Sequence, residues 1–224
     1  MHVRPRTSPR FSPPDSPTLV EEYSLVAQGF VRIAGLDEAG RGSWAGPMVA
    51  AAVRLPLHEE GLLESLDGVR DSKQLTPAAR GRMFRRVIDC ALDVGVGVVS
   101  AWTIDRVGLS RAWQMAMIWA LDDMAVRPDG LLIDAFPIRG CPLPQRPIVH
   151  GDTLSLSIAA ASIVAKVSRD HMMIAADRVF PSYGFALHKG YGTSAHRQAL
   201  EREGPCTFHR FSFSPLRDDW RLPL

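Results

Sequence analysis

Short apolar runs alternate along the chain with longer segments whose apolar residues recur at helical spacing, and this alternation restricts the fold more than any other feature. The short runs are rich in β-branched residues, which favours strands. In chain order the elements read β-β-α-β-α-β-β-α-α, which is typical of an α/β fold with a mixed sheet flanked by helices. The predicted strands cover residues 31–36, 48–55, 94–101, 131–133 and 147–149, and the predicted helices cover residues 76–92, 110–126, 152–180 and 194–202.

The two ends of the chain differ in composition from its middle. Five of the 17 prolines fall within the first 17 residues, mixed with Ser, Thr and Arg, so residues 1–28 are predicted to form a flexible tail. Residues 29–204 are predicted to form one domain. Within it, segment 152–180 is apolar on nearly every side, which describes a central helix buried against the sheet. Residues 205–224 are less regular and are predicted to form a small helical appendage.

The composition excludes several classes of protein. The longest apolar runs, such as residues 48–53, are far shorter than the ~20 residues of a membrane-spanning helix, so no membrane contact is expected. Cys90, Cys141 and Cys206 are widely spaced and contain no C-x-x-C pair, which indicates neither a disulfide framework nor a structural zinc site. The simplest expectation is a reduced, cytoplasmic protein, and we expect it to act as a monomer.

Four acidic residues share one kind of position: Asp37, Glu38, Asp134 and Asp152 each stand where an apolar strand gives way to a turn. Ligands of open α/β sheets gather outside the carboxyl ends of strands, so these side chains are predicted to lie close together. Carboxylates that crowd in this way need divalent cations, and hard oxygen ligands favour Mg²⁺ or Mn²⁺. Two such ions support in-line displacement at a phosphate.

Each of these positions also has a simpler interpretation. A lone Asp at a strand end is usually a turn former, and Asp152 could cap the helix that follows it. Successive strand residues point to opposite faces, so Asp37 and Glu38 reach one site only if the strand ends or bends between them. Ala39 and Gly40 make such a bend plausible.

Gly40-Arg41-Gly42 has two interpretations, and the pattern alone does not choose between them. The segment could be no more than a tight turn between two strands. Alternatively, its glycines leave backbone N–H and C=O groups uncovered, so that the backbone can approach a polar ligand closely.

Six sequence blocks occur in order between about residues 31 and 216, and together they resemble the ribonuclease HII family. The first and the fifth blocks are long enough that chance is not a serious explanation. The blocks are Asp37-Glu38-Ala39-Gly40-Arg41-Gly42 with Ala45-Gly46-Pro47, Asp71-Ser72-Lys73-Gln74-Leu75-Thr76, Leu132-Ile133-Asp134, Gly151-Asp152, Ala159-Ala160-Ala161-Ser162-Ile163-Val164-Ala165-Lys166-Val167-Ser168-Arg169-Asp170, and Tyr183-Gly184-Phe185 with His188-Lys189-Gly190-Tyr191-Gly192-Thr193.

The resemblance implies a ribonuclease H-like fold and an endonuclease that cuts the RNA strand of RNA/DNA hybrids and single ribonucleotides in duplex DNA, leaving 5′-phosphate and 3′-hydroxyl ends. It implies that two Mg²⁺ or Mn²⁺ ions are bound by four catalytic carboxylates. It also implies that the backbone of Gly40, Arg41 and Gly42 contacts the ribose 2′-hydroxyl, the group that separates RNA from DNA. Tyr191 would stack on the sugar of the neighbouring deoxynucleotide. The implied carboxylates are Asp37, Glu38, Asp134 and Asp152.

All three lysines fall inside these blocks, although the chain has 23 arginines. Ammonium and guanidinium groups are not interchangeable, so we interpret Lys73 and Lys189 as substrate-binding residues. Lys166 is expected to pair with Asp170, which lies four residues later on the same helical face, and this pairing is preferred to a metal-binding role for Asp170.

Other polar residues receive weaker interpretations. Arg82, Arg85 and Arg86 would share one side of a helix, as a solvated face or as a contact with the duplex backbone. Ser43-Trp44 departs from the Pro and aliphatic residue common in the family. The histidines at 150, 188, 196 and 209 have the right pKa range for acid–base work but no predicted catalytic role.

Two rival functions remain open. A related nuclease, such as a ribonuclease HIII-like enzyme or a DNA junction nuclease, would share the carboxylates; the junction nuclease would not require a 2′-hydroxyl. A non-catalytic hybrid-binding protein would use the same carboxylates as caps and turns. Incision of a duplex that contains one ribonucleotide, with none in an all-DNA duplex, separates the predicted activity from a DNA junction nuclease and a binding protein.

Overall fold

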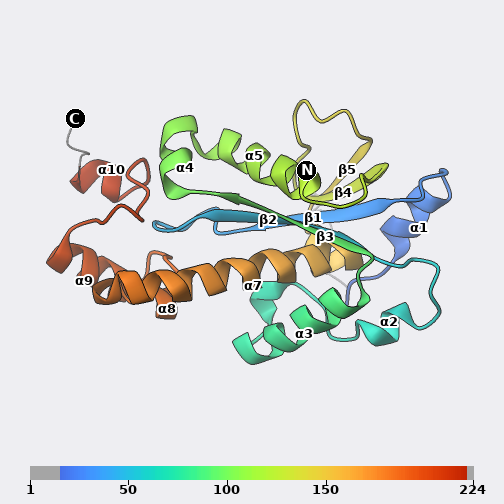
Figure 1. Cartoon of the computed structure of the whole chain (residues 1–224), viewed down its shortest axis with the longest axis horizontal. Helices are drawn as coiled ribbons and strands as arrows, with labels where there is room; N and C mark the ends of the chain where they lie inside the picture. The colour runs from blue at the N-terminus through green and yellow to red at the C-terminus, as the bar shows by residue number, and fades with distance from the viewer. Residues whose placement is uncertain (1–15, 221–224) are drawn as a thin grey trace, which may run out of the picture.

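A computed structural model describes residues 16–220 of the chain. Its centre is a mixed five-stranded sheet in the order β3-β2-β1-β4-β5, with α4 and α5 over one face and α3 and α7 over the other (Figure 1). This arrangement confirms the predicted fold class. The strands are β1 Ile33–Ala39, β2 Met48–Arg54, β3 Asp93–Val99, β4 Gly130–Asp134 and β5 Gln145–Ile148. The helices are α1 Val20–Val26, α2 Leu62–Ser65, α3 Pro77–Cys90, α4 Ala101–Val107, α5 Leu109–Asp122, α6 Gly151–Leu154, α7 Leu156–Val179, α8 Phe185–His188, α9 Ser194–Glu203 and α10 Leu216–Asp219, with the 3₁₀ turns η1 Ser72–Gln74 and η2 Pro181–Tyr183.

β1 is the central strand and differs on its two sides. It pairs with β2 in antiparallel orientation, and this pairing continues to Ala39. On its other side it pairs with β4 in parallel, and this pairing stops at Leu36 opposite Ile133. One edge of β1 therefore carries no β4 partner at Asp37 and Glu38.

The sheet separates two hydrophobic layers. α7 packs directly on β1, because a Cβ atom built on Gly35 would lie only 2.2 Å from the backbone carbon of Ser157. α5 covers the opposite face with Trp113 and Met117, both buried. The predicted central helix is therefore confirmed as buried against the sheet.

Hydroxyl side chains set where several helices begin. Thr76 caps α3 by accepting a hydrogen bond from the Ala79 N–H, with Pro77 in the first turn. Ser155 caps α7 by accepting from the Ile158 N–H, so the predicted helix 152–180 is two helices, α6 and α7. Ser100 caps α4, a helix that the sequence did not predict.

The predicted flexible tail of residues 1–28 is wrong for its described second half, while residues 1–15 lie outside the described residues. α1 lies against the joint between α6 and α7, where Thr18 bridges to Ser155. Glu22 of α1 is fully buried, and its Oε1 accepts hydrogen bonds from the hydroxyl groups of Ser155 and Ser157 and from the Ser157 N–H. The proline-rich composition of the segment gave no sign that Glu22 is buried.

Glu22→Ala is expected to lower the free energy of unfolding by about 2–4 kcal/mol, because it leaves buried hydroxyl and N–H donors of Ser155 and Ser157 without their acceptor. Glu21→Ala is the matched control. Glu21 forms a partly exposed ion pair with Arg146, and its loss should cost under about 1 kcal/mol. Urea unfolding of both variants checks the difference, and equal costs would mean that Glu22 does not organise the joint.

The predicted appendage of residues 205–224 is packed rather than separate as far as residue 220. Phe208 and Leu216 share a hydrophobic cluster with Met173 of α7 and Phe185 of α8. The short helix α10 fits the predicted helical character. These residues therefore belong to the packing of the main domain.

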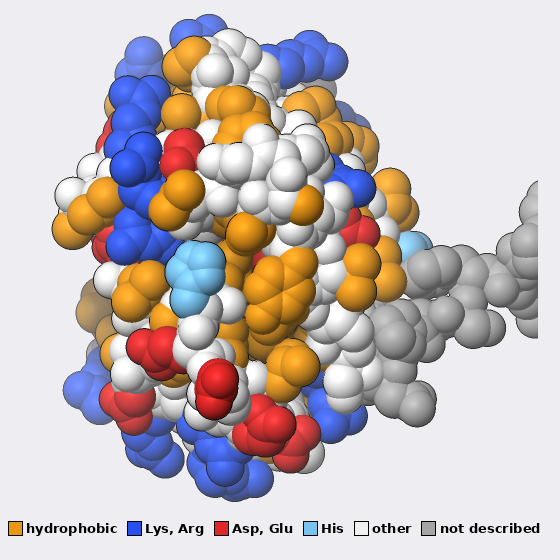
Figure 2. Space-filling model, turned by 90° about the vertical axis from the view of Figure 1, so that its right-hand side faces the viewer, with side chains coloured by type: hydrophobic (Ala, Val, Ile, Leu, Met, Phe, Trp, Pro, Cys, Tyr) orange, Lys and Arg blue, Asp and Glu red, His pale blue; other side chains and the backbone are white. Residues whose placement is uncertain are grey.

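Charge is mixed on the side of the molecule that lies to the right in Figure 1. Figure 2 shows acidic and basic side chains there, with hydrophobic side chains between them. Within residues 16–220, no helix is both long and apolar enough to cross a membrane.

Candidate active site

The four predicted carboxylates come from three elements. Asp37 and Glu38 lie near the end of β1, Asp134 is the last residue of β4, and Asp152 lies in α6. Because β1 and β4 run parallel, Asp134 ends beside Asp37. The Gly151 N–H donates a hydrogen bond of 2.8 Å to Asp134 Oδ1, which ties the start of α6 to the end of β4.

The side chains of Asp37 and Glu38 point to opposite faces of the sheet. The hydroxyl of Ser162, on α7, hydrogen-bonds to Asp37, whereas Glu38 Oε2 accepts a 2.9 Å hydrogen bond from Trp113 Nε1 on α5. β1 continues through both residues to Ala39, so the predicted end or bend between them does not occur. Since the pairing of β1 with β4 ends at Leu36, the two carboxylates act on each other around the unpaired edge of β1 instead.

Mutual repulsion shows that the carboxylates share one electrostatic environment. Burial, followed by repulsion from Glu38 and Asp134, raises the pKa of Asp37 well above its usual range. Burial also raises the pKa of Glu38, against the hydrogen bond from Trp113. Burial and repulsion from Asp71 and Asp134 raise the pKa of Asp152. The site is therefore short of positive charge.

Lys73 supplies part of that charge. Its Nζ lies 3.5 Å from Asp152 Oδ2 and 3.9 Å from Asp71 Oδ1. Burial alone would lower the pKa of Lys73, but attraction to Asp71 and Asp152 and to the other carboxylates raises it. Its side chain is 72% exposed, so the ammonium faces both the cluster and the solvent.

The chemistry of the donors fits a hard divalent cation, since four carboxylates from three elements converge on one edge of the sheet. Among residues 16–220, no group of three or more His, Cys, Asp or Glu side chains is already placed to hold a metal ion. The alternative roles of these acids, as turn formers or as a helix cap, fit the structure less well. Ser155 and not Asp152 caps α7, and Asp37 and Glu38 lie within a strand instead of in a turn.

Gly40 occupies a place that no other residue fits. Its φ of +87° lies in the left-handed region, and a Cβ atom built there would lie 2.0 Å from Arg169 Nε. Gly42 is different, because nothing lies within 4 Å of its built Cβ. Backbone conformation and the contact with Arg169 require glycine at position 40, whereas neither applies at position 42. The open side of Gly42 is available to a ligand.

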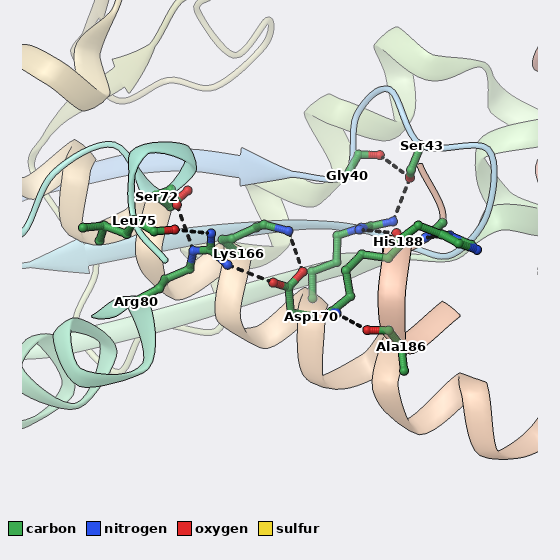
Figure 3. Close-up of polar contacts among 12 residues, drawn as sticks. Gly40, Ser43, Ser72, Leu75, Arg80, Lys166, Asp170, Ala186 and His188 are labelled. Atoms are coloured by element: carbon green, nitrogen blue, oxygen red, sulfur yellow. Dashed lines mark hydrogen bonds and ion pairs between the residues drawn. The ribbon is translucent and has the colours of Figure 1, made fainter. Parts of the chain in front are cut away.

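Two buried arginines hold the segment that follows Gly40. Arg169 of α7 is fully buried and donates hydrogen bonds to the carbonyls of Pro47, Ala45 and Lys189 and to Ser43 Oγ, at 2.7–3.0 Å. Ser43 Oγ in turn donates to the Gly40 carbonyl, as Figure 3 shows.

Arg210 is the second of these arginines. It donates to the carbonyls of Arg41 and Gly46, at 3.0 Å each. Burial, reinforced by the nearby charge of Arg169, lowers the pKa of Arg210 to about 9. Residues 41–47 are thus fixed from α7 and from the segment after α9.

Gly40→Ala is expected to lower the free energy of unfolding by about 2–4 kcal/mol, because the left-handed backbone is strained and the new methyl group collides with Arg169. Gly42→Ala should change stability by less than about 0.5 kcal/mol. If the backbone at Gly42 approaches the substrate, this variant still loses cleavage activity. Thermal unfolding with cleavage assays distinguishes a ligand contact from a mere turn, and full activity in Gly42→Ala would select the turn.

Tyr191 and Lys189 lie on the loop between α8 and α9. The Tyr191 ring is partly exposed, with Arg169 Cζ 5.3 Å and Lys166 Nζ 5.6 Å from its centroid. The Lys189 ammonium donates a hydrogen bond to the Ala186 carbonyl, and the Lys189 carbonyl accepts one from Arg169. The Tyr191 ring is thus accessible to solvent on one side, while the Lys189 ammonium is held within its own loop.

The pair between Lys166 and Asp170 is confirmed, and Figure 3 shows that it belongs to a larger network. Lys166 Nζ lies 2.6 Å from Asp170 Oδ1, and Arg80 Nη1 lies 3.2 Å from Asp170 Oδ2. Arg80 also donates to the carbonyls of Ser72 and Leu75. Asp170 therefore anchors the loop that carries Lys73. On α3 itself, Arg82, Arg85 and Arg86 are exposed.

Sequence reasoning missed several residues that shape the site. Trp113 and Ser162 each bond one carboxylate of β1, Asp71 adds a further negative charge, and Arg169 and Arg210 hold residues 41–47. Ser162 and Arg169 stand inside a recognised block, so their position was available as a signal. Nothing in the pattern around Trp113 or Arg210 indicated these contacts.

Comparison with known proteins places the chain in a family. The family model for ribonuclease HII matches residues 34–215. Ribonuclease HII of Roseiflexus castenholzii is 54% identical over 202 residues, covering 90% of this chain and 90% of that protein. The crystal structure of ribonuclease H2 from Pyrococcus horikoshii OT3 is similar with a TM-score of 0.71 and 25% identity, covering 84% of this chain and 96% of that one.

A further solved structure shares the fold alone. It is Bst-RNase HIII in complex with Mn²⁺, with a TM-score of 0.65 and 23% identity, covering 84% of this chain and 68% of that one. The match to the family model and the relative that is 54% identical together decide the assignment. The chain belongs to the ribonuclease HII family and is an endoribonuclease.

Proposed function

We propose that this ribonuclease HII, an endonuclease for the RNA strand of RNA/DNA hybrids, also incises duplex DNA at single embedded ribonucleotides and leaves 5′-phosphate and 3′-hydroxyl ends. The observation that carries the proposal is the convergence of Asp37, Glu38, Asp134 and Asp152, whose burial and repulsion leave the site short of positive charge. We infer that the protein acts as a cytoplasmic monomer.

The cofactors are two Mg²⁺ or Mn²⁺ ions held by the four carboxylates. When bound, such ions activate water and steady the leaving oxygen at a phosphate. The solved ribonuclease HIII with Mn²⁺ supports a divalent ion in this fold. The chain's own contribution is to hold Asp37 on the central strand, to orient Asp134 through Gly151, and to keep Lys73 beside Asp152.

Substrate recognition is assigned to the residues around the cluster. The backbone of Gly40, Arg41 and Gly42 contacts the ribose 2′-hydroxyl, and the open side of Gly42 leaves room for it. Tyr191 stacks on the adjoining deoxyribose. The exposed ammonium of Lys73 suits a phosphate next to the cluster. A substrate contact by Lys189 requires its ammonium to leave the Ala186 carbonyl.

Cleavage of three matched duplexes tests the proposal: an RNA/DNA hybrid, a DNA duplex with one ribonucleotide, and the same duplex in DNA only. We expect the first two to be cut when Mg²⁺ or Mn²⁺ is present and neither after chelation with EDTA. Cleavage of the all-DNA duplex would point to a junction nuclease. Cleavage of the hybrid alone would refute the single-ribonucleotide activity.

A further inference from the structure

Three buried histidines lie beside the loop that carries Tyr191. His188, His196 and His209 are 8%, 0% and 1% exposed. The rings of His188 and His196 stack with centroids 4.4 Å apart, and His196 Nε2 lies 3.0 Å from His209 Nε2. Such a group could be ordinary core packing, but its polar contacts fix the position of every ring proton.

The ring proton of His209 is placed by the contacts of its Nδ1 with Cys206. The backbone N–H of Cys206 donates to His209 Nδ1 at 3.0 Å, and the Sγ and carbonyl oxygen of Cys206 lie 3.2 and 3.3 Å from the same nitrogen. The N–H contact is the shortest of the three and needs the Nδ1 lone pair. At the other end of the pair, the Tyr191 carbonyl can only accept from His196, and this is compatible only with an unprotonated Nδ1 on a neutral His209. A neutral imidazole carries one proton, so that of His209 is on Nε2.

The ring proton of His196 follows from that of His209. His209 Nε2–H donates to His196 Nε2 at 3.0 Å, which leaves the proton of His196 on Nδ1. His196 Nδ1–H in turn donates to the Tyr191 carbonyl at 3.0 Å. The result is a chain of hydrogen bonds with one direction, from the Cys206 N–H to the Tyr191 carbonyl.

Both histidines of this chain are neutral. Burial lowers the pKa of His196 to about 4, and burial together with the neighbouring His196 lowers the pKa of His209 to about 4. A charged ring at either position would set two N–H groups against each other. The chain therefore persists through the neutral pH range.

His188 fixes the same loop from the other side. The Gly190 N–H donates to His188 Nδ1 at 3.1 Å, so the proton of His188 is on Nε2, which donates to the Tyr183 carbonyl at 2.8 Å. The Gly190 carbonyl accepts from the Trp44 N–H at 2.8 Å. Residues 190 and 191 are thus held next to the segment that follows Gly40.

We propose that His209 and His196 are positioning residues for Tyr191, and that their hydrogen-bond relay fixes the height and tilt of the Tyr191 platform from the segment after α9. The proposal rests on the proposed function, because it assumes that Tyr191 meets the substrate. It gives residues 205–210 a part in substrate selection, although they lie outside the six sequence blocks. Neither histidine touches the reacting atoms.

Nitrogen-15 NMR of the wild-type protein at neutral pH tests the relay without an assay. We expect protons on Nδ1 of His196 and on Nε2 of His188 and His209, with a coupling across the hydrogen bond between His196 and His209. Any other tautomer, or a charged ring in the pair, would overturn the relay. Because it uses the wild-type protein, this measurement does not depend on whether a variant folds.

Two amide substitutions at one position test the positioning. His209→Asn keeps an acceptor near the place of Nδ1 but has no donor that reaches His196, whereas His209→Gln places an amide donor near Nε2. We expect His209→Asn to lower kcat on the single-ribonucleotide duplex about tenfold, the equivalent of one hydrogen bond, with little change in KM. His209→Gln should restore most of the rate.

A double-mutant cycle completes the test. In a Tyr191→Ala background, His209→Asn should lower the rate by less than about twofold, because the platform that it positions is gone. Equal losses in His209→Asn and His209→Gln, or an undiminished loss in the Tyr191→Ala background, would reduce His209 to a structural residue. Absence of single-ribonucleotide incision by the wild-type protein would instead refute the proposed function, and the NMR result would still decide on the relay.

Discussion

Asp37→Asn is expected to abolish Mg²⁺-dependent cleavage, with a loss of at least about 10³-fold, and at the same time to stabilise the metal-free protein. Asp37 is 4% exposed, and burial with repulsion from Glu38 and Asp134 raises its pKa. An amide of the same shape removes the buried negative charge. We expect the free energy of unfolding to rise by about 1–3 kcal/mol at neutral pH without metal.

The pH dependence of this gain has a definite sign. A raised carboxyl pKa means that the folded state binds its proton more tightly than the unfolded state does. Wild-type stability is therefore lost as the pH rises from the ordinary value of 3.8 through the raised value of Asp37. Asp37→Asn lacks this loss, so its advantage over the wild type should grow with pH in chelator-treated samples.

Asp122→Asn is the control for this experiment, because Asp122 is an exposed residue of α5. It should change neither cleavage nor stability by a measurable amount. Added Mg²⁺ should raise the melting temperature of the wild type and of Asp122→Asn, but much less that of Asp37→Asn. Normal cleavage by Asp37→Asn would remove Asp37 from the catalytic set.

Arg169→Met is expected to produce the largest loss of stability, about 3–5 kcal/mol, which is a large part of the 5–15 kcal/mol typical of a domain. It leaves the buried carbonyls of Pro47, Ala45 and Lys189 without their donor. Arg169→Lys should recover only a part of this loss, since one ammonium cannot reproduce the fork of a guanidinium.

Arg178→Met provides the comparison for Arg169→Met, because it makes the same substitution at an exposed position of α7. It should cost less than about 0.5 kcal/mol. Denaturant unfolding measures both, and cleavage per folded molecule should fall in Arg169→Lys because residues 41–47 lose their fixed position. A cost near that of Arg178→Met would show that Arg169 is dispensable for this segment.

Hydrophobic periodicity predicted most of the sheet and its covering helices, because these elements are set by which face meets the core. The segment 152–180 shows the limit of that signal. Apolar residues run through the whole segment, so a pattern of apolar positions predicts one helix. The helix is nevertheless interrupted at Ser155, which caps the start of α7. α1 was missed for a related reason, since Glu22 is an acid and its burial depends on partners more than 130 residues away.

The carboxylates show which part of the site a sequence can specify. The residue types and the parallel strand ends predicted that Asp37, Glu38, Asp134 and Asp152 would meet. The way in which Asp37 and Glu38 meet depends on where β4 stops, and this is a property of two strands together. The donors that hold them, Trp113 and Ser162, come from opposite layers, which no local pattern relates.

The hydrogen bonds from Arg210 to the carbonyls of Gly46 and Arg41 join residues that lie 164 and 169 positions apart in the sequence. A ribosome makes residues 41–46 long before it makes Arg210. The sheet can form while synthesis continues, but the loop beside Gly40 receives its last donors only when Arg210 has left the exit tunnel. The loop of residues 41–47 therefore stays without the Arg210 hydrogen bonds until more than 160 later residues have been made, although β1 and β2 on either side of it are among the first strands synthesised.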